Sequence, residues 1–315
     1  MRKSPYPLLC LLLILLLCLG CSRKAYVEGE KQWDYQSFRD SQSSYTSKDG
    51  IIKYIDRGEG EVILLLHGVP SSSWLYRKMI DGLVDGGHRV IAPDMLGYGN
   101  SANPDGYNIY GPEAHAERLL GLMDHLNIPR WTQVMHDAGG LWTWAMLGID
   151  KSTVKRLIVL NSIIYESGFE PPVRMKPGIF AKISMWAYTN GITTNFLLRQ
   201  LFKIGLQEDN LTKQEVEGYK KPLREGKVKG MYAFFTKTEE KLPNYSELLK
   251  SLDIPSMIIW GKHDEMLMWA PQSQAVKSDL NIKDSDVHIL EAKHFIQEEK
   301  PNEINKLILE FVNRE

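Results

Sequence analysis

The feature that most constrains the fold of this 315-residue chain is an alternation of short, continuous apolar runs with longer amphipathic segments. The apolar runs have the length and branched side chains of strands buried on both faces, and helical spacing follows most of them. Such an alternation predicts an α/β fold in which a mostly parallel sheet carries helices on both faces. The predicted strands are VILLL (62–66), RVIAPD (89–94), WTQVMH (131–136), VKRLIVLNS (154–162), SMIIW (256–260) and DVHIL (286–290).

An earlier strand-like run, IIKYI (51–55), precedes the first of these strands. The stretch between the two runs, DRGEGE (56–61), is rich in turn-forming residues. Two extended runs separated by a short turn cluster fit a β-hairpin. We therefore expect the two runs to pair with each other.

The alternation stops between residues 166 and 250, where helical, aromatic-rich pieces follow one another, and it resumes after residue 251. One α/β domain with a helical insertion explains this pattern better than two domains in tandem. We expect residues 46–165 and 251–315 to form the two parts of the core and residues 166–250 to form a helical cap.

The N-terminus has the pattern of an export signal. Arg2 and Lys3 precede a leucine-rich run over residues 8–19, which ends at Gly20 and Cys21. A basic start, a short apolar stretch and a small residue are typical of a secretory signal peptide, and the run is shorter than the ~20 residues that span a bilayer comfortably. The ending resembles a bacterial lipoprotein signal, in which the cysteine after the cleavage site is lipidated.

These residues predict a signal over residues 1–21, a polar tether over residues 22–45 and a lipoprotein of the bacterial cell envelope that is attached to the membrane through Cys21. A plain signal peptide and an uncleaved anchor are the alternatives.

Composition narrows the expected partners. The formal net charge is -1, so no long-range positive field favours nucleic acid. All three cysteines lie within the first 21 residues, which leaves the folded part without a cysteine-based metal site or an internal disulfide. We expect a small-molecule substrate, no cofactor and no metal.

The stretch VMHDAGG (134–140) places an acidic residue between a predicted strand and a predicted helix. A sharp strand-to-helix turn exposes one side chain at the carboxyl edge of the sheet, beside the positive end of the helix. Asp137 occupies that position, and the backbone N–H of Ala138 is a candidate donor to an oxyanion. The alternative is that Asp137 only caps the helix, which is a common role for aspartate.

Three further positions follow other predicted strands. The N–H of Val69, after His-Gly, is a second candidate oxyanion donor; Asp264 follows SMIIW; and His294 lies just beyond the last strand. Nucleophile, acid and histidine in this order, each after its own strand, is the order of α/β-hydrolases. Because the carboxyl ends of parallel strands meet at one edge, these side chains are expected to lie together.

On these residues the chain resembles the haloalkane dehalogenase and epoxide hydrolase branch of the α/β-hydrolase superfamily. The similarity is strongest in HGVPSSSWLYRKM (67–79), RVIAPDMLGYGNS (89–101), VMHDAGG and KHFIQEEKP (293–301). The resemblance implies that Asp137 is the nucleophile, His294 the general base and Asp264 the acid that orients it. It also implies a helical cap over the site. An aspartate that attacks a saturated carbon forms an alkyl ester, which water activated by His294 then hydrolyses.

The leaving group of the reaction stays open between two types of chemistry. Haloalkane dehalogenases usually carry a tryptophan after the nucleophile and an asparagine after His-Gly, and these positions hold Ala138 and Val69. Trp186 of the cap is then the candidate contact for a halide. Epoxide opening instead needs a proton donor for the alkoxide, and Tyr219 and Tyr232 of the cap are the candidates. A different reading, supported by the missing halide donors, is a membrane-anchored protein that binds a ligand on this fold without catalysis.

Overall fold

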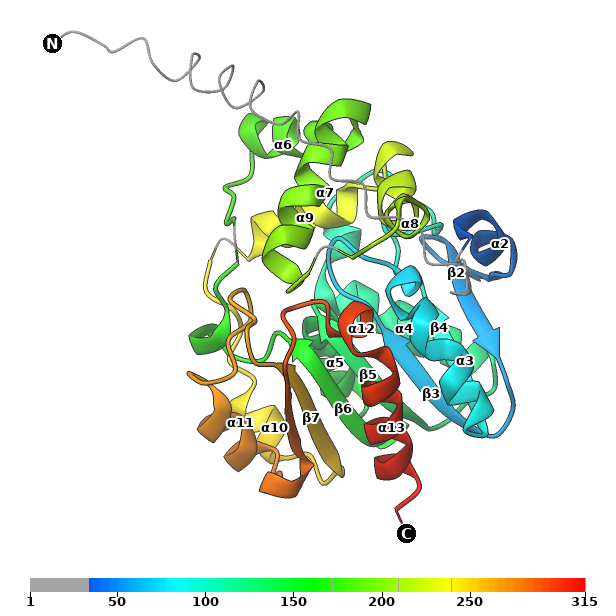
Figure 1. Ribbon diagram of the computed structural model, residues 1–315, viewed down its shortest axis with the longest axis vertical. Coiled ribbons are helices and arrows are strands. Elements are labelled where there is room, and N and C mark those ends of the chain that lie inside the picture. The colour runs from blue at the N-terminus through cyan, green and yellow to red at the C-terminus, as the bar shows by residue number, and fades with distance from the viewer. Residues whose placement is uncertain (1–33, 172, 209, 239, 315) are drawn as a thin grey trace, which may run out of the picture. The chain divides into compact units, whose positions relative to one another are not determined.

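The computed structural model describes residues 34–171, 173–208, 210–238 and 240–314 (Figure 1). The predicted signal, including Cys21, and residues 22–33 of the predicted tether lie outside these ranges. Among the described residues the first regular elements are helix α2 (Tyr35–Asp40) and strand β1 (Ser43–Ser47), both of which begin before the boundary expected at residue 45. The aromatic residues Tyr35 and Phe38 of α2 are buried, which explains why this polar segment is ordered.

Eight strands form one sheet in the order β1-β2-β4-β3-β5-β6-β7-β8. All neighbouring strands from β4 to β8 in this order are parallel, whereas β2 pairs antiparallel with β1 and with β4. The predicted mostly parallel sheet is confirmed. The strands after β1 are β2 (Gly50–Arg57), β3 (Glu61–Leu66), β4 (His88–Pro93), β5 (Trp131–Asp137), β6 (Val154–Ser162), β7 (Ser256–Gly261) and β8 (Val287–Leu290).

The predicted hairpin between β2 and β3 is wrong. Strand β4 lies between them: β2 pairs with β4 in the register Tyr54↔Pro93, and β3 pairs with β4 on its other side. The turn residues 58–60 are present, but the chain after β3 returns through a helix and inserts β4 next to β3 as a parallel strand. The turn residues therefore predict that the chain reverses between β2 and β3, but they do not predict which strand pairs with β2.

Helices cover both faces of the sheet, as predicted. Helix α3 (Arg77–Asp85) packs against α13 (Pro301–Val312) on one face, and α4 (Pro112–His125) packs against α5 (Gly139–Ile149) on the other (Figure 1). The remaining helices of the core are α10 (Ser246–Lys250), α11 (Ser273–Asp279) and α12 (Ile296–Glu299). The central strands are almost wholly buried between these layers; every residue of β5 and of β7 is buried.

Four helices lie together beyond the carboxyl ends of the central strands (Figure 1): α6 (Ile179–Thr189), α7 (Gly191–Gly205), α8 (Lys213–Arg224) and α9 (Lys229–Lys237). They fall within the segment predicted to form a cap. Helix α8 begins with a capping box, in which Thr212 and Glu215 bond to each other's backbone N–H groups. In the part of the chain that the structure describes, we find no helix of the length and apolarity needed to cross a membrane.

Candidate active site

Asp137 ends strand β5, and helix α5 begins two residues later, so the chain turns sharply at this position. The backbone of Asp137 has φ +51°, in the left-handed region that few non-glycine residues adopt. A side chain at Gly68 would place its Cβ 2.3 Å from the Cβ of Asp137, so this neighbour must be glycine. Helix α5 has Ala138 as its N-cap and no side-chain cap bond, which argues against the alternative that Asp137 serves as its cap.

The two predicted oxyanion donors both contact the Asp137 carboxylate. The N–H of Val69 donates to Asp137 Oδ1 over 2.6 Å, and the N–H of Ala138 also hydrogen-bonds to this carboxylate. Asp137 Oδ2 faces the imidazole of His294, whose Nε2 lies 3.8 Å away. Oδ1 of Asp137 is thus held by the Val69 N–H, while Oδ2 faces the predicted base.

His294 and Asp264 form the second half of the predicted arrangement. His294 Nδ1 donates to Asp264 Oδ2 over 2.9 Å, and both side chains are buried. The other oxygen of Asp264, Oδ1, accepts from the N–H groups of Met266 (2.9 Å) and Leu267 (3.0 Å). The structure therefore brings together Asp137, His294 and Asp264, the three side chains that the sequence analysis expects to meet, with His294 between the two carboxylates.

Asn161 is a site residue that the sequence analysis missed. Its amide nitrogen donates to Asp264 Oδ2 over 2.6 Å and to the carbonyl of Lys293 over 3.2 Å, and its side-chain oxygen accepts from Gly261 N over 2.8 Å. The amide therefore connects the ends of β6 and β7 to the loop that carries His294. The only signal in the sequence is a polar residue at the end of an apolar strand.

Burial and the neighbouring charges shift the pKa values of Asp137, Asp264 and His294. Burial raises the pKa of Asp137, and His294 with the two backbone donors offsets this only in part. Burial acts the same way on Asp264, but His294 and the hydrogen bond from Asn161 outweigh it, so the pKa of Asp264 is lowered. Burial lowers the pKa of His294, but the Asp264 and Asp137 carboxylates outweigh it, so this pKa is raised above its ordinary value.

A second buried histidine supports the loop of His294. His136 precedes Asp137, and its Nε2 donates to the backbone carbonyl of His294 over 3.0 Å. Burial lowers the pKa of His136 well below its ordinary value, and the charge of His294 acts in the same direction. His136 therefore stays neutral and fixes the position of the loop.

The model of the alpha/beta hydrolase fold family matches residues 61–301 of this chain. The chain belongs to this family. It is 25% identical to the AB hydrolase superfamily protein YfhM of Bacillus subtilis (strain 168), over 86% of this chain and 98% of that protein. It is 28% identical to a haloalkane dehalogenase of Mycolicibacterium paratuberculosis, over 81% and 85%, and 27% identical to epoxide hydrolase 3 of Xenopus tropicalis, over 83% and 74%.

Solved structures agree on the fold of this α/β-hydrolase. The M145A mutant of an epoxide hydrolase from Bacillus megaterium superposes with a TM-score of 0.69 at 24% identity, over 86% of this chain and all of that one. A thermophilic esterase from Thermogutta terrifontis gives a TM-score of 0.68 at 21% identity, over 86% and 97%. The predicted resemblance to the haloalkane dehalogenase and epoxide hydrolase branch is confirmed, and the chain is a hydrolase.

The three cap residues predicted to contact a leaving group make the following contacts in this α/β-hydrolase. Trp186 is 60% exposed on α6, so it does not line an enclosed site. The Tyr232 hydroxyl accepts a hydrogen bond from Gly178 N over 3.3 Å, and its ring packs on that of Tyr107. The Tyr219 hydroxyl donates to Glu298. No hydrogen bond or ion pair among the described residues joins any of the three predicted cap residues to Asp137.

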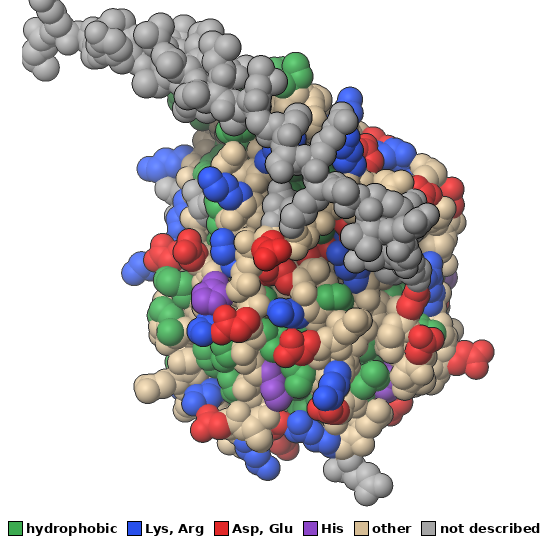
Figure 2. All heavy atoms as spheres, viewed as in Figure 1, with side chains coloured by type: hydrophobic (Ala, Val, Ile, Leu, Met, Phe, Trp, Pro, Cys, Tyr) green, Lys and Arg blue, Asp and Glu red, His purple; other side chains and the backbone are tan. Residues whose placement is uncertain are grey.

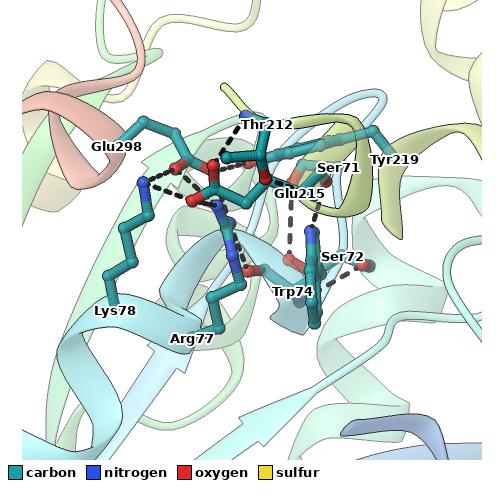
Figure 3. Close-up of polar contacts among 9 residues, drawn as sticks. All are labelled: Ser71, Ser72, Trp74, Arg77, Lys78, Thr212, Glu215, Tyr219 and Glu298. Carbon is teal, nitrogen blue, oxygen red and sulfur yellow. Dashed lines mark hydrogen bonds and ion pairs between the residues drawn. The ribbon is translucent and has the colours of Figure 1, made fainter. Parts of the chain in front are cut away.

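Glu298 belongs to a buried ionic cluster that joins the cap to the core (Figure 3). Arg77 of α3 donates to Glu298 of α12 over 2.8 Å and to Glu215 of cap helix α8 over 2.9 Å. Lys78 lies 2.7 Å from Glu215 and 3.0 Å from Glu298. The cluster has two cations, Arg77 and Lys78, and two carboxylates, Glu215 and Glu298, so it is neutral overall. Through Glu298, which follows His294 by four positions, it ties cap helix α8 to the segment that carries His294.

The cluster holds its carboxylates in the charged form. Burial tends to raise the pKa of Glu215, but Lys78, the Thr212 N–H and Arg77 outweigh it and lower this pKa to about 2. Burial is likewise outweighed at Glu298, mainly by Arg77, and its pKa is lowered. Because these pKa values are depressed on folding, the cluster stabilises the native state fully above about pH 4.5, and this stabilisation is lost as the pH falls toward 2.

We expect Glu298→Gln to lower the free energy of unfolding by about 3–5 kcal/mol, because it leaves buried Arg77 and Lys78 with a single carboxylate. Urea unfolding monitored by circular dichroism measures the change. In the double variant Arg77→Met/Glu298→Gln the charges balance again, so the loss should be smaller than the sum of the single losses. Lys48→Met, at the exposed pair with Glu117, is the control and should change stability little. A Glu298→Gln variant as stable as the wild type would contradict the role of the cluster.

Tyr98 is a buried residue next to His67, which precedes the Gly68–Val69 turn, and the sequence analysis did not single it out. It lies between two turn glycines, and its buried ring packs against Trp142 and His67. A Cβ on Gly230 of cap helix α9 would lie 3.0 Å from its hydroxyl. Burial and the charge of Asp137 raise the pKa of Tyr98 well above its ordinary value, so this phenol keeps its proton at neutral pH.

Proposed function

We propose that this α/β-hydrolase opens a bond at a saturated carbon of a small apolar electrophile through a covalent alkyl ester on Asp137. The observation that carries the proposal is the arrangement at Asp137, with one oxygen held by the Val69 N–H and the other facing His294. A serine esterase mechanism is not supported, because residue 137, at the sharp turn between β5 and α5, carries a carboxylate and not a hydroxyl.

In the first step Asp137 Oδ2 attacks the substrate carbon, the C–O ester bond forms and the bond to the leaving group breaks. Oδ2 is the suitable oxygen because Oδ1 accepts from the Val69 N–H. The raised pKa of Asp137 marks a carboxylate that is poorly solvated and therefore more reactive as a nucleophile.

In the second step His294 Nε2 removes a proton from water, and the hydroxide attacks the carbonyl carbon of the Asp137 ester. The negative charge develops on Oδ1, which already accepts from the Val69 N–H, so this donor need not move when the charge appears. The ester C–O bond then breaks, and the proton passes from His294 to the departing alkoxide. The carboxyl group of Asp137 then releases the second proton of the water and is again a carboxylate. Asp264 stabilises the imidazolium through its 2.9 Å hydrogen bond.

Single turnover in ¹⁸O-labelled water tests the ester. With enzyme in excess over substrate, the label should enter the Asp137 carboxylate, because water attacks this carbonyl, and peptide mass spectrometry measures its mass increase. Product that carries the label while Asp137 stays unlabelled would show direct attack of water on the substrate and would overturn the proposal.

The pH dependence of ester hydrolysis gives a prediction of its own. In the free enzyme the Asp137 charge helps to raise the pKa of His294, and this charge is lost in the ester. Hydrolysis needs neutral His294, so its rate should rise with pH, with a midpoint below the pKa of His294 in the free enzyme. Single-turnover rates measure the midpoint of ester hydrolysis, and NMR titration of the imidazole measures the pKa of His294 in the free enzyme. In Asp137→Asn the pKa of His294 from NMR should fall. Equal values for ester hydrolysis, the free wild type and free Asp137→Asn would contradict the coupling.

We propose an epoxide as the class of substrate. Halide departure needs N–H donors, whereas Ala138 and Val69 supply no side-chain donor and Trp186 is exposed. Epoxide opening needs a proton for the alkoxide, and Tyr98 is a protonated phenol within the field of Asp137. The named relatives include haloalkane dehalogenases as well as an epoxide hydrolase, so halide release is the second candidate.

The variant Tyr98→Phe separates the two candidates. For an epoxide we expect formation of the Asp137 ester to slow by about 10²-fold, because general-acid assistance is lost. For an alkyl bromide, which needs no proton, the rate should stay close to that of the wild type. Rapid-quench assays of both substrates measure this, and Tyr107→Phe, at an exposed ring outside the site, is the control. An equal effect on both substrates would argue against Tyr98 as the proton donor.

We also propose export and anchoring through Cys21, supported by the residues of the leader alone. Intact mass of the membrane-extracted protein should show a lipid that is absent from Cys21→Ser. An unmodified Cys21 would refute this proposal.

A further inference from the structure

Helices α6 and α7 of the cap expose a set of large apolar side chains, which we call the apolar ridge. Phe180 is 83% exposed, Ile192 77% and Trp186 60%. The other members of the ridge are Ile179, Ile183 and Phe196. Exposed apolar clusters of this kind mark interaction surfaces, because leaving them in water is unfavourable. The two helices pack against each other at the end of the domain opposite the C-terminus (Figure 1).

The charged residues of the segment that carries the apolar ridge have one sign. Between residues 171 and 207 the sequence contains no Asp or Glu, whereas acidic and basic side chains are mixed on the face of the domain that Figure 2 shows. The basic residues of this segment are Arg174, Lys176, Lys182, Arg199 and Lys203. Arg174 is paired with Glu166, and Lys182, Arg199 and Lys203 are exposed.

The exposed side chains along α7 change from apolar to basic toward its C-terminal end. Ile192 and Phe196 lie on one exposed stripe, and Arg199 and Lys203 continue this stripe. Phe196 and Lys203 are separated by roughly 10 Å along the helix. Apolar side chains at one level and cations about 10 Å above them match the acyl and headgroup levels of a bilayer.

The folded domain also begins on the side of the cap. Helix α2 contacts the C-terminal end of α8 through Arg39 with Glu225 (2.8 Å) and Lys221 with Gln36 (2.8 Å), and α8 packs against α7. The twelve residues 22–33 separate Cys21 from the first described residue, a reach of roughly 40 Å at full extension. A chain anchored at Cys21 thus has its cap within reach of the membrane surface.

From these observations we infer that the apolar ridge docks the cap onto an anionic phospholipid bilayer. The apolar side chains enter the acyl region, and the cations contact the phosphate groups of the lipids. The position of the cap then exposes the site to apolar compounds that partition into the membrane. This inference uses the proposed anchor for proximity, but it concerns a separate surface with its own spectroscopic signal.

Trp186 provides that signal, because the other six described tryptophans are buried or half-buried. The full chain is reconstituted into vesicles of phosphatidylcholine with phosphatidylglycerol, with and without brominated acyl chains, which quench tryptophan on contact. The difference in emission between wild type and Trp186→Phe isolates this residue. We expect bromine to remove most of this difference signal, and added salt to restore it.

Two sets of variants test the two parts of the surface. Phe180→Ser/Ile192→Ser should abolish the quenching, and Ile149→Ser, at a 55% exposed isoleucine of α5, is the matched control that should leave it unchanged. Replacement of Lys182, Arg199 and Lys203 by glutamine should weaken docking roughly fivefold per cation in the anionic vesicles.

Four outcomes would overturn the inference. Trp186 emission that is unquenched in vesicles carrying the chain shows that the cap does not dock, although the anchor holds. A blue shift without bromine quenching shows that the leader covers the ridge, and a shift that depends on protein concentration shows a second copy. A chain that fails to float with anionic vesicles contradicts both the docking and the anchor.

Discussion

Asp137→Asn is expected to lower kcat by about 10⁴-fold or more, because the amide cannot displace a leaving group from carbon. The fold should persist, since asparagine tolerates the φ of +51° and its side-chain oxygen still accepts from the Val69 N–H. Product formation under saturating substrate measures the loss, and thermal unfolding verifies that the protein is folded. Alanine is a poorer choice, because it removes this acceptor and is strained at positive φ.

The matched control is Asp150→Asn. Asp150 accepts from the Ser152 N–H at the end of α5, so it is an aspartate with a capping role and no part in the site. It should keep the turnover of the wild type. If Asp137→Asn turned over substrate as fast as this control, the carboxylate would have a structural role only. Equal ligand binding by the wild type and Asp137→Asn, with no turnover of any substrate by either, would favour the non-catalytic ligand-binding alternative.

His294→Gln should stop the reaction at the ester. Glutamine leaves Asp137 free to attack but cannot take a proton from water, so hydrolysis should slow by about 10²- to 10⁴-fold while the ester accumulates. Intact-protein mass spectrometry after mixing with substrate measures the adduct. The mass also identifies the chemistry: ring opening adds the whole mass of an epoxide, whereas displacement of a halide adds the mass of the haloalkane less that of the hydrogen halide.

The control for this experiment is His263→Gln, at an exposed histidine that pairs with Glu291 outside the site. It should show rapid turnover and no adduct. Absence of an adduct in His294→Gln, with every epoxide and haloalkane offered, would argue against an ester on Asp137. An adduct on another residue would argue against Asp137 as the nucleophile.

The sequence was informative about Asp137, His294 and Asp264 because parallel strands impose their geometry. A polar residue after each buried strand must lie at the carboxyl edge. In the structure His294 lies 3.8 Å from the Asp137 carboxylate and 2.9 Å from that of Asp264. The donors Val69 and Ala138 were predictable for the same reason, since their N–H groups follow strand β3 and precede helix α5.

Other residues gave no usable signal. Tyr219 looks like any cap tyrosine in the sequence, and only its contact with Glu298, 79 positions away, shows that its hydroxyl belongs to the ionic cluster. In the sequence Asn161 is only the polar end of a predicted strand, yet its side chain bonds to Asp264. Tyr98 is only part of a turn, yet the charge of Asp137 raises its pKa. The exposure of Trp186 likewise depends on which face of α6 packs against the other cap helices.

By itself the sequence determined seven of the eight described strands, the sharp turn at Asp137 and the order of the three site residues, because these follow from periodicity and from the local turn between β5 and α5. The tertiary structure alone decided the partner of β2, the ionic cluster of Arg77 and Glu298, and the exposed ridge on the cap. The physical reason is that strand pairing, ion pairing and burial depend on which distant segments meet, and a polar or aromatic side chain is compatible with several such neighbours until the fold selects one.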